Sequence, residues 1–270
     1  MDMKTLFKDQ GYAITRASDH ETIDAVRDAG VRAIEFATVG DPTKRNWTLR
    51  DGTFKHYMNP HLTDDAFRRL VDSPGIVNCV KAILGPQPAV ITHSKVSYKF
   101  AGKRHYWYPH QDAGYKAKLR KGFAIAVYLA DCSAGNGTLE FYPESHKLGL
   151  IQHRRQPNRH ENMHQAVVDS VVNISPKFIE GEAGTIVCFD LLLVHSSREN
   201  KAGGCRPIFL FEVKPFFFFP LADTGENGYV INGRAFKPFL FLGPRLLRLS
   251  KSIKEMMRRA RLRLNPVATS

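Results

Sequence analysis

The sequence predicts a mainly β protein, an all-β sandwich or barrel preceded by two helices. Short segments rich in β-branched and aromatic residues follow one another from residue 89 onward, and turn-forming residues separate them. No helix is expected between these segments, which is typical of a sandwich or barrel core. The two segments with helical spacing of apolar residues both come before residue 89.

The first expected helix covers residues 19–36, where apolar residues recur at roughly helical spacing between Ile23 and Ile34. The second covers residues 63–84. Thr63 or a neighbour is a candidate N-cap, and Gly85-Pro86 is expected to end the helix. We expect both helices to pack on one sheet of the β core.

The expected strands are short and are bounded by Gly, Pro, Asn and Asp. They cover residues 89–100, 123–130, 137–142, 171–175, 185–189 and 207–213. Residues 148–169 are polar and contain several His and Arg residues. We expect a long loop or an insertion there, of the kind that often serves as a lid.

The length of 270 residues suits one large domain with a sizeable core. We expect a single domain over residues 1–240, with helices in 1–88 and the strand core in 89–220, followed by a tail over 241–270. No apolar run reaches the roughly 18 residues of a membrane span. The first residues lack the apolar stretch of a secretory signal, so the expected location is cytoplasmic.

The net charge of +13 is concentrated near the C-terminus. Residues 244–264 contain eight basic residues and one acid, and their apolar residues recur at helical spacing. A basic amphipathic helix is typical of an element that lies on an anionic membrane surface. We expect peripheral contact with the inner membrane surface, the alternative being a helix that packs on the domain. Nucleic acid is disfavoured, because residues 244–264 contain no aromatic residue and the chain has no nucleic-acid-binding motif.

The segment Tyr108-Pro109-His110-Gln111-Asp112 contains an H-x-D pair. Residues two apart in a strand point to the same side, so His110 and Asp112 are expected to project together. An imidazole nitrogen and a carboxylate oxygen suit iron(II). Such a pair is a weak signal by itself, because the chain has 11 histidines.

A third candidate ligand, His195, ends the apolar run that follows the strand over residues 185–189. That position is expected where a strand meets an open pocket. Arg206 follows eleven residues later, at the start of the next strand, where its guanidinium could bind a carboxylate in two-point fashion. Together, two histidines, one carboxylate and one arginine predict a metal site beside an anion site.

With these residues in place, the sequence resembles the phytanoyl-CoA dioxygenase family of iron(II)- and 2-oxoglutarate-dependent oxygenases. The resemblance extends over most of the chain and rests on the order and spacing of several short motifs. They are Gly11-Tyr12, Leu84-Gly85, Pro109-His110-Gln111-Asp112, Gly135-Asn136-Gly137-Thr138-Leu139, Pro143-Glu144-Ser145-His146-Lys147, Gly184, His195, Ser197 and Arg206.

The resemblance implies a double-stranded β-helix, also called a jelly roll or cupin-like fold, with supporting helices. It implies that iron(II) is held by three residues: His110, Asp112 and His195. It further implies that Arg206 binds the distal carboxylate of 2-oxoglutarate, that Ser197 assists it, and that Thr138 lines the co-substrate pocket. The implied reaction uses 2-oxoglutarate and dioxygen to hydroxylate a small molecule, and releases succinate and carbon dioxide.

Two positions can be compared with the residues usual in this family and its relatives, one in the expected iron site and one in a turn. Related halogenases replace the carboxylate ligand with a small residue, so Asp112 favours hydroxylation. The family usually has Gly where this chain has Glu144, which is expected to change a loop and leave the iron site intact.

Other residues are candidates for the substrate pocket. We expect Trp107 and its neighbours, with Lys95 and Tyr98 on the strand over residues 89–100, to face it. The cluster of arginines at 154, 155 and 159 suggests an anionic substrate. The sequence does not predict the identity of the substrate or the oligomeric state.

Two alternatives remain open at this point. The first is a cupin-like metal isomerase, which would need neither Arg206 nor 2-oxoglutarate. The second is a jelly-roll binding or sensor module without catalytic turnover. The complete set of three ligand candidates and one arginine argues against the second alternative, because degenerate relatives commonly lack a ligand.

Overall fold

The structure of the chain is a computed structural model. It describes most of residues 1–231, with gaps between the described ranges. These ranges are residues 1–16, 20–39, 46–48, 54–103, 106–114, 122–155, 164–166, 173–215 and 229–231.

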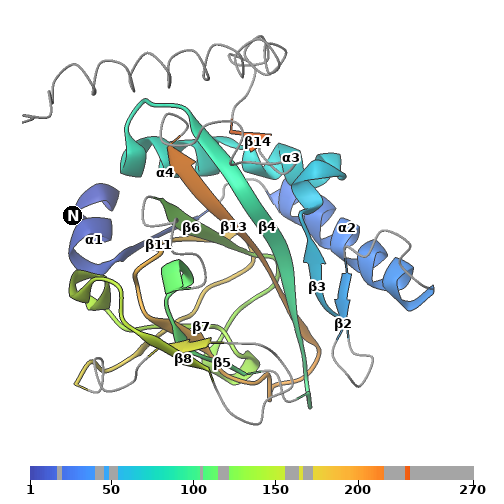
Figure 1. Cartoon of the computed structure of the whole chain (residues 1–270). Coiled ribbons are helices and arrows are strands. Elements are labelled where there is room, and N and C mark those ends of the chain that lie inside the picture. The colour runs from blue at the N-terminus through green and yellow to red at the C-terminus, as the bar shows by residue number, and fades with distance from the viewer. Residues whose placement is uncertain are drawn as a thin grey trace, which may run out of the picture.

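Two antiparallel sheets face each other in the described part of the chain (Figure 1). The large sheet has the order β1-β11-β6-β13-β4-β3-β2, with β14 also paired to β4. The small sheet has the order β10-β7-β12-β5. The strands of the large sheet are β1 (Tyr12–Arg16), β2 (Asn46–Thr48), β3 (Phe54–Met58), β4 (Ala89–Phe100), β6 (Phe123–Tyr128), β11 (Thr185–Asp190), β13 (Cys205–Pro215) and β14 (Tyr229–Val230). Those of the small sheet are β5 (Trp107–His110), β7 (Leu139–Phe141), β10 (Lys177–Ile179) and β12 (His195–Ser197).

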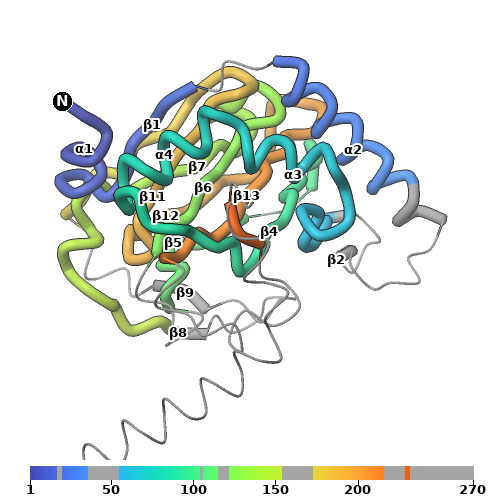
Figure 2. Tube along the Cα trace, turned by 90° about the horizontal axis from the view of Figure 1, so that it is seen from above, coloured from blue at the N-terminus to red at the C-terminus, as the bar shows by residue number. Residues whose placement is uncertain are grey.

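In the described part of the chain, helices α1 to α4 cover the outer face of the large sheet (Figure 2). They are α1 (Met3–Gln10), α2 (His20–Val39), α3 (Asp65–Val71) and α4 (Pro74–Leu84). One hydrophobic core lies between these helices and the sheet, with Ile23, Phe67 and Ile76 packed against Val96 and Phe209. The expectation that the N-terminal helices pack on one sheet is therefore confirmed.

A second hydrophobic core lies between the two sheets. It joins Tyr128 of β6 and Phe189 of β11 to Phe141 of β7 and Ile179 of β10. Strand β6 contributes to both cores, because its residues alternate between them and all six are buried. Covering on both faces explains why this strand is a continuous apolar run. Two facing sheets with helical support form the jelly roll that the resemblance implied.

The second expected helix, over residues 63–84, is wrong as a single element. The chain forms a 3-10 turn, η1 (Pro60–Leu62), and then two helices, α3 and α4. Asp64 caps α3 by accepting a hydrogen bond from the Ala66 amide. Pro74 occupies the first turn of α4, where a missing amide hydrogen costs nothing. The expected end at Gly85 is confirmed.

Most of the expected strands are present, and β4 has the predicted bounds. The strand over residues 171–175 is wrong: residues 173 and 174 form a turn and a bend, and β10 begins at Lys177. The very short strand β12, which carries a candidate ligand, was not predicted from the sequence. The strand assumed for both His110 and Asp112 is only partly correct, because β5 ends at His110 and Asp112 begins a 3-10 turn. Strand β1, which pairs with β11 and extends the large sheet, was not predicted either.

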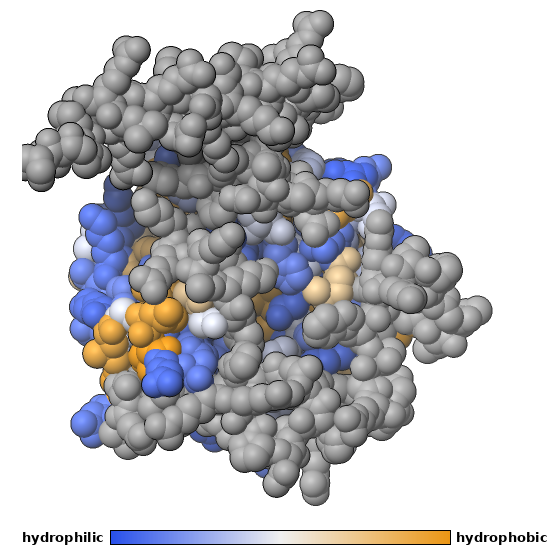
Figure 3. Space-filling model, viewed as in Figure 1, coloured by the Kyte–Doolittle hydropathy of each residue, from blue (hydrophilic) through white to orange (hydrophobic). Residues whose placement is uncertain are grey.

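Part of the polar segment over residues 148–169 forms a small separate sheet of β8 (His153–Arg155) and β9 (His164–Ala166). Residues 156–163, which include Arg159, residues 167–169 and the tail over residues 241–270 lie outside the described residues. No helix within the described ranges is long and apolar enough to cross a membrane. The described surface in Figure 3 is largely hydrophilic, with hydrophobic residues gathered at the lower left.

Candidate metal centre

Two neighbouring strands of the small sheet bring the two candidate histidines together. Strand β5 ends at His110, strand β12 begins at His195, and these two residues are paired across the antiparallel ladder. Asp112 follows β5 at the start of a 3-10 turn, η2 (Asp112–Gly114). Residues directly opposite on one sheet point to the same side, so both imidazoles project into the space between the sheets.

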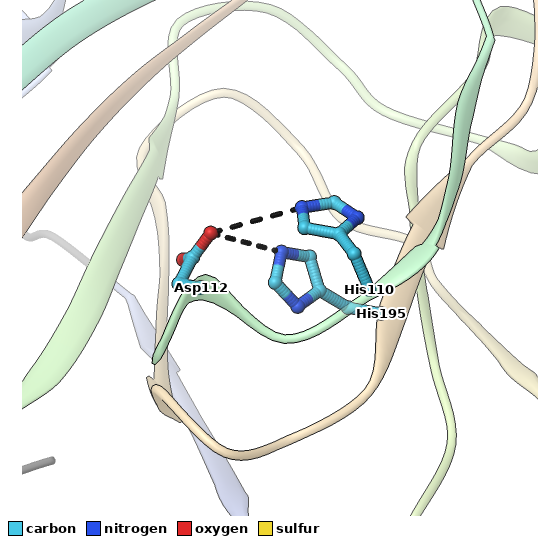
Figure 4. A group of neighbouring side chains, drawn as sticks. All are labelled: His110, Asp112 and His195. Atoms are coloured by element: carbon cyan, nitrogen blue, oxygen red, sulfur yellow. Dashed lines mark ion pairs between the residues drawn. The ribbon is translucent and has the colours of Figure 1, made fainter. Parts of the chain in front are cut away.

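The three side chains converge on one point (Figure 4). Their ligand atoms all lie within 4.8 Å of one another. The Oδ1 atom of Asp112 is 3.7 Å from Nε2 of His110 and 3.7 Å from Nε2 of His195. Three ligand atoms at such separations can bind one ion on a single face and leave its other positions open.

Backbone carbonyls orient both imidazoles. Nδ1 of His110 lies 2.6 Å from the Tyr108 carbonyl, and Nδ1 of His195 lies 3.0 Å from the Leu193 carbonyl. A carbonyl oxygen only accepts, so each Nδ1 carries the hydrogen and each Nε2 presents a lone pair towards Asp112. This outer hydrogen bond is a regular feature of histidines that bind metals.

The protonation states also suit a metal. Burial, followed by the nearby His195, lowers the pKa of His110 to about 3, so its imidazole is neutral at physiological pH. Burial opposes ionisation of Asp112, but His195 and His110, together with Lys95 and His93, outweigh it and lower the pKa of Asp112. A neutral imidazole and an ionised carboxylate are the forms that bind metal.

Gln111, between the two ligand positions, fastens this turn to the rest of the molecule. Its side chain is fully buried, donates to the carbonyls of Gly149 and Leu192, and accepts from the Ile151 amide. No role for Gln111 was predicted from the sequence. A glutamine has both donors and an acceptor, and all are used here, so the residue holds Asp112 in place through the backbone.

Arg206 lies in the same cavity as the three candidate ligands. Its side chain is nearly fully buried, and its Nε atom has no hydrogen-bond partner. Burial lowers the pKa of Arg206 but cannot remove the charge of a guanidinium group. Within the described ranges it forms no ion pair. A buried, charged group with an unused donor fits a site for an anionic ligand.

The other two expected co-substrate residues are buried nearby, and both use their hydroxyl groups within the protein. Ser197 lines the cavity and donates to the Gly137 carbonyl at 2.8 Å. Thr138 donates to the Ile179 carbonyl and lies close to the hydroxyl of Tyr128. Thr138 is not among the residues that line the cavity.

The pocket residues proposed from the sequence separate into two groups. Lys95 and Trp107 line the cavity. Tyr98 does not, because it points to the opposite face of β4 and donates to the Gly30 carbonyl of α2 at 2.9 Å. Alternation along β4 explains the difference. Other residues of these strands line the cavity without having been predicted, namely His93 and Ser97 of β4 and Glu212 of β13.

The sequence model of one protein family, phytanoyl-CoA dioxygenase (PhyH), matches residues 7–208 of the chain. An L-proline trans-4-hydroxylase from Streptomyces griseoviridis is 28% identical over 170 residues, which cover 56% of this chain and 63% of that enzyme. A probable alpha-ketoglutarate-dependent hypophosphite dioxygenase from Stutzerimonas stutzeri is 24% identical over 247 residues, 85% of each chain.

A similar fold occurs among solved structures. The structure of EctD from S. alaskensis with 2-oxoglutarate and 5-hydroxyectoine superposes with a TM-score of 0.64 at 17% identity. The superposition covers 78% of this chain and 74% of that one. At this level of identity the match supports the fold, and the chemistry rests on the residues of the site.

Proposed function

Because the chain belongs to the phytanoyl-CoA dioxygenase family, we propose that it is an iron(II)- and 2-oxoglutarate-dependent oxygenase that hydroxylates a small molecule. One observation carries the proposal: a single cavity contains the convergent His110, Asp112 and His195 and the buried guanidinium of Arg206. The relatives named as hydroxylase and dioxygenase support the same reaction class.

In this proposal, His110, Asp112 and His195 bind iron(II) on one face. Their donor set, two neutral imidazoles and one carboxylate, is the one found in non-haem iron oxygenases. Bound iron supplies the activation of dioxygen. The carbonyls of Tyr108 and Leu193 orient the two imidazoles so that each Nε2 atom is aimed at the metal position, and the burial of the site excludes most solvent.

The role of Arg206 is to bind the distal carboxylate of 2-oxoglutarate. A guanidinium matches a carboxylate in two-point fashion, and its burial strengthens the interaction. The proposed products are succinate, carbon dioxide and hydroxylated substrate. Asp112 fills the position that a halide would need, so we propose hydroxylation in preference to halogenation.

The test is the visible charge-transfer absorption that forms when iron(II) and a 2-oxo acid bind together. Protein purified without oxygen should give this band only when both iron(II) and 2-oxoglutarate are present. Arg206→Met should need more 2-oxoglutarate to form it, whereas Arg69→Met, an exposed arginine of α3, should behave as wild type. Absence of the band in the wild type would contradict the proposal.

The basic segment over residues 244–264 carries a second, separate proposal: peripheral attachment to anionic lipid, which would bring the enzyme to a membrane-associated substrate. Its support is the charge and the helical spacing of the sequence. Flotation with vesicles of anionic lipid compares the full chain with a chain ending at residue 243. Equal binding by the two forms would exclude this segment as the anchor.

A further inference from the structure

The expected site for the distal carboxylate of 2-oxoglutarate is made from both sheets. Arg206 lies near the start of β13 in the large sheet, and Ser197 is the last residue of β12 in the small sheet. Both side chains are buried and both line the cavity. Two groups on different layers bind one ligand well only when the spacing between the layers is fixed. The distance between the sheets at this point therefore sets the width of the site.

Lys99 of β4 joins the two sheets beside Arg206. The two residues are paired across the antiparallel ladder, and residues directly opposite in a sheet project to the same side. The side-chain amino group of Lys99 reaches the small sheet, where it donates to the Ser197 carbonyl at 2.8 Å and to the Arg198 carbonyl. A side chain from the sheet of Arg206 thus holds the backbone of Ser197.

The chain that leaves β12 is held by Lys99 where the ladder of the small sheet stops. Ser197 is the last residue of β12 that pairs with β7, where it lies opposite Leu139. Residues 198–200 follow and belong to no strand. Asn200 donates from its side chain to the Lys99 carbonyl at 2.9 Å. Hydrogen bonds to Lys99 therefore fasten both ends of this short stretch to β4.

Gly137 packs closely against the same contact. A Cβ atom at residue 137 would lie 2.4 Å from the carbonyl oxygen of Arg198 and 3.1 Å from Cδ of Lys99. The carbonyl of Gly137 accepts the hydrogen bond of the Ser197 hydroxyl. One tightly packed cluster therefore fixes the Lys99 side chain and the Ser197 hydroxyl together.

A lysine is costly to bury in this position. Lys99 is fully buried, and in the described part of the chain its amino group bonds two carbonyls and forms no ion pair. Burial, followed by the neighbouring Arg206, lowers the pKa of Lys99 well below its ordinary value. An uncharged amino group still has two hydrogens for the two carbonyls, so the tie between the sheets persists in either protonation state.

We propose that Lys99 is a positioning residue for 2-oxoglutarate: it ties the end of β12 to β4 and so sets the distance between Ser197 and Arg206. This inference rests on the proposed function, which assigns the distal carboxylate to Arg206. The metal ligands are fixed separately. His195 lies at the other end of β12, is paired with His110, and bonds the Leu193 carbonyl through its imidazole. Loss of Lys99 therefore weakens the binding of 2-oxoglutarate and spares the binding of iron(II).

The experiment compares the binding of 2-oxoglutarate by the wild type, Lys99→Met and Lys99→Arg. Oxygen-free protein loaded with iron(II) is titrated, and the charge-transfer band is followed. The rise in unfolding temperature of metal-free protein with 2-oxoglutarate gives a second readout that needs no iron. Iron(II) affinity is measured for each protein before 2-oxoglutarate is added. Lys81→Met, which removes an exposed lysine of α4, is the matched control.

We expect Lys99→Met to bind 2-oxoglutarate about tenfold more weakly, because the end of β12 shifts once its two carbonyls lose their donor. Its iron(II) affinity should equal that of the wild type. Lys99→Arg keeps donors at this position and should bind 2-oxoglutarate more tightly than Lys99→Met. Lys99→Gln, which is too short to reach both carbonyls, replaces Lys99→Met if that variant does not fold, and the same weakening is expected. Lys81→Met should bind both ligands as the wild type does.

A double-mutant cycle shows whether Lys99 acts through Ser197. Ser197→Ala removes the hydroxyl that Lys99 is proposed to position. In that background, Lys99→Met should weaken the binding of 2-oxoglutarate less than it does in the wild type, because the two residues act as one unit.

Three results would overturn the inference: equal binding of 2-oxoglutarate by Lys99→Met and the wild type, an equal loss of iron(II) affinity in Lys99→Met, or strictly additive effects in the cycle with Ser197→Ala. Failure of the proposed function looks different. In that case the wild type itself gives neither a charge-transfer band nor a rise in unfolding temperature with 2-oxoglutarate.

Discussion

Arg206 shows how a single residue can be placed at a cost to stability for the sake of a ligand. A guanidinium that is nearly fully buried, with an unused Nε donor, is unfavourable in the free protein. The imidazoles of His110 and His195 donate from Nδ1 to backbone carbonyls, which turns their Nε2 atoms towards Asp112. The proposed reaction supplies a ligand for each of these groups, a carboxylate for Arg206 and iron(II) for the imidazoles.

The first prediction concerns the chemistry of that guanidinium. Arg206→Lys keeps the charge but loses the two-point geometry, so the dissociation constant of 2-oxoglutarate should rise by roughly 30-fold, equivalent to about 2 kcal/mol. The measurement is an anaerobic titration of the charge-transfer band. Iron(II) affinity should not change, and an equal weakening of iron binding would show that the variant has disturbed the whole site.

The second prediction concerns Glu144, which replaces the glycine usual in the family. Its backbone is left-handed, with φ 66°, a conformation that costs a residue with a Cβ atom about 1 kcal/mol. Glu144→Gly should therefore be more stable to denaturant than Glu144→Ala by about 1 kcal/mol, although both lose the contact with Lys147. Equal free energies of unfolding for the two variants would mean that the turn relaxes to another backbone conformation. Iron binding should be the same in both variants.

At the scale of the elements, a buried hydrogen bond joins α2 to the large sheet. The Tyr98 hydroxyl of β4 donates to the Gly30 carbonyl of α2. A Cβ atom at residue 30 would lie only 2.7 Å from that hydroxyl oxygen, so the glycine in the middle of this helix permits the close approach. The side of β4 that faces α2 is thus structural, while the other side forms the cavity wall.

The third prediction follows from that contact. Tyr98→Phe should lower the free energy of unfolding by about 1–2 kcal/mol, because the buried hydrogen bond between the Tyr98 hydroxyl and the Gly30 carbonyl is lost. Tyr57→Phe is the matched control: its hydroxyl contacts Thr63 at an exposed position, where water can replace it. Chemical denaturation of both variants gives the comparison. A loss of stability in Tyr57→Phe as large as that in Tyr98→Phe would contradict the stabilising role of the hydrogen bond between Tyr98 and Gly30.

The elements that the sequence predicted best are those with a clear pattern of their own. Strand β4 is long and rich in β-branched residues, and its bounds were predicted correctly. Strand β12, with three residues, has too short a pattern to detect, and its pairing with partners distant in sequence creates it. The helix over residues 63–84 was wrong because Pro74 was read as part of a helix interior and not as the start of a new helix.

The same contrast holds for the site. The candidates His110, Asp112, His195 and Arg206 were recognisable from motif and spacing, and the structure brings them into one cavity. The cavity wall of His93, Lys95 and Glu212 depends on which face of β4 and β13 is turned inward. A bulge in β13 between Glu212 and Val213 shifts the pairing of β13 with β4. The sequence alone therefore does not reveal which side chains of these two strands line the cavity.

At the scale of the whole molecule, stability should depend on pH through the buried imidazole of His110. Its pKa is about 3 in the folded metal-free protein, against the ordinary value of 6.5 for a histidine in an unfolded chain. Between these values the unfolded chain binds a proton that the folded protein does not, so stability is full above pH 6.5 and falls as the pH drops.

The fourth prediction is therefore a loss of about 1–2 kcal/mol in the free energy of unfolding of metal-free protein between about pH 7.5 and pH 5. His110→Gln removes the titrating group and should show a smaller loss over the same range. Denaturant titrations at the two pH values measure both proteins. An identical pH dependence in the variant would exclude His110 as the source.

The central claim is that His110, Asp112 and His195 form the metal site of a 2-oxoglutarate-dependent oxygenase, and succinate formation tests it most directly. With iron(II), 2-oxoglutarate and dioxygen, the wild type is expected to form succinate, and Asp9→Ala, which removes an exposed carboxylate of α1, should match it. Asp112→Ala should lose at least about 99% of this activity, in line with other ligand or catalytic-group removals. Succinate formation by Asp112→Ala at the wild-type rate, or none by the wild type, would contradict the claim.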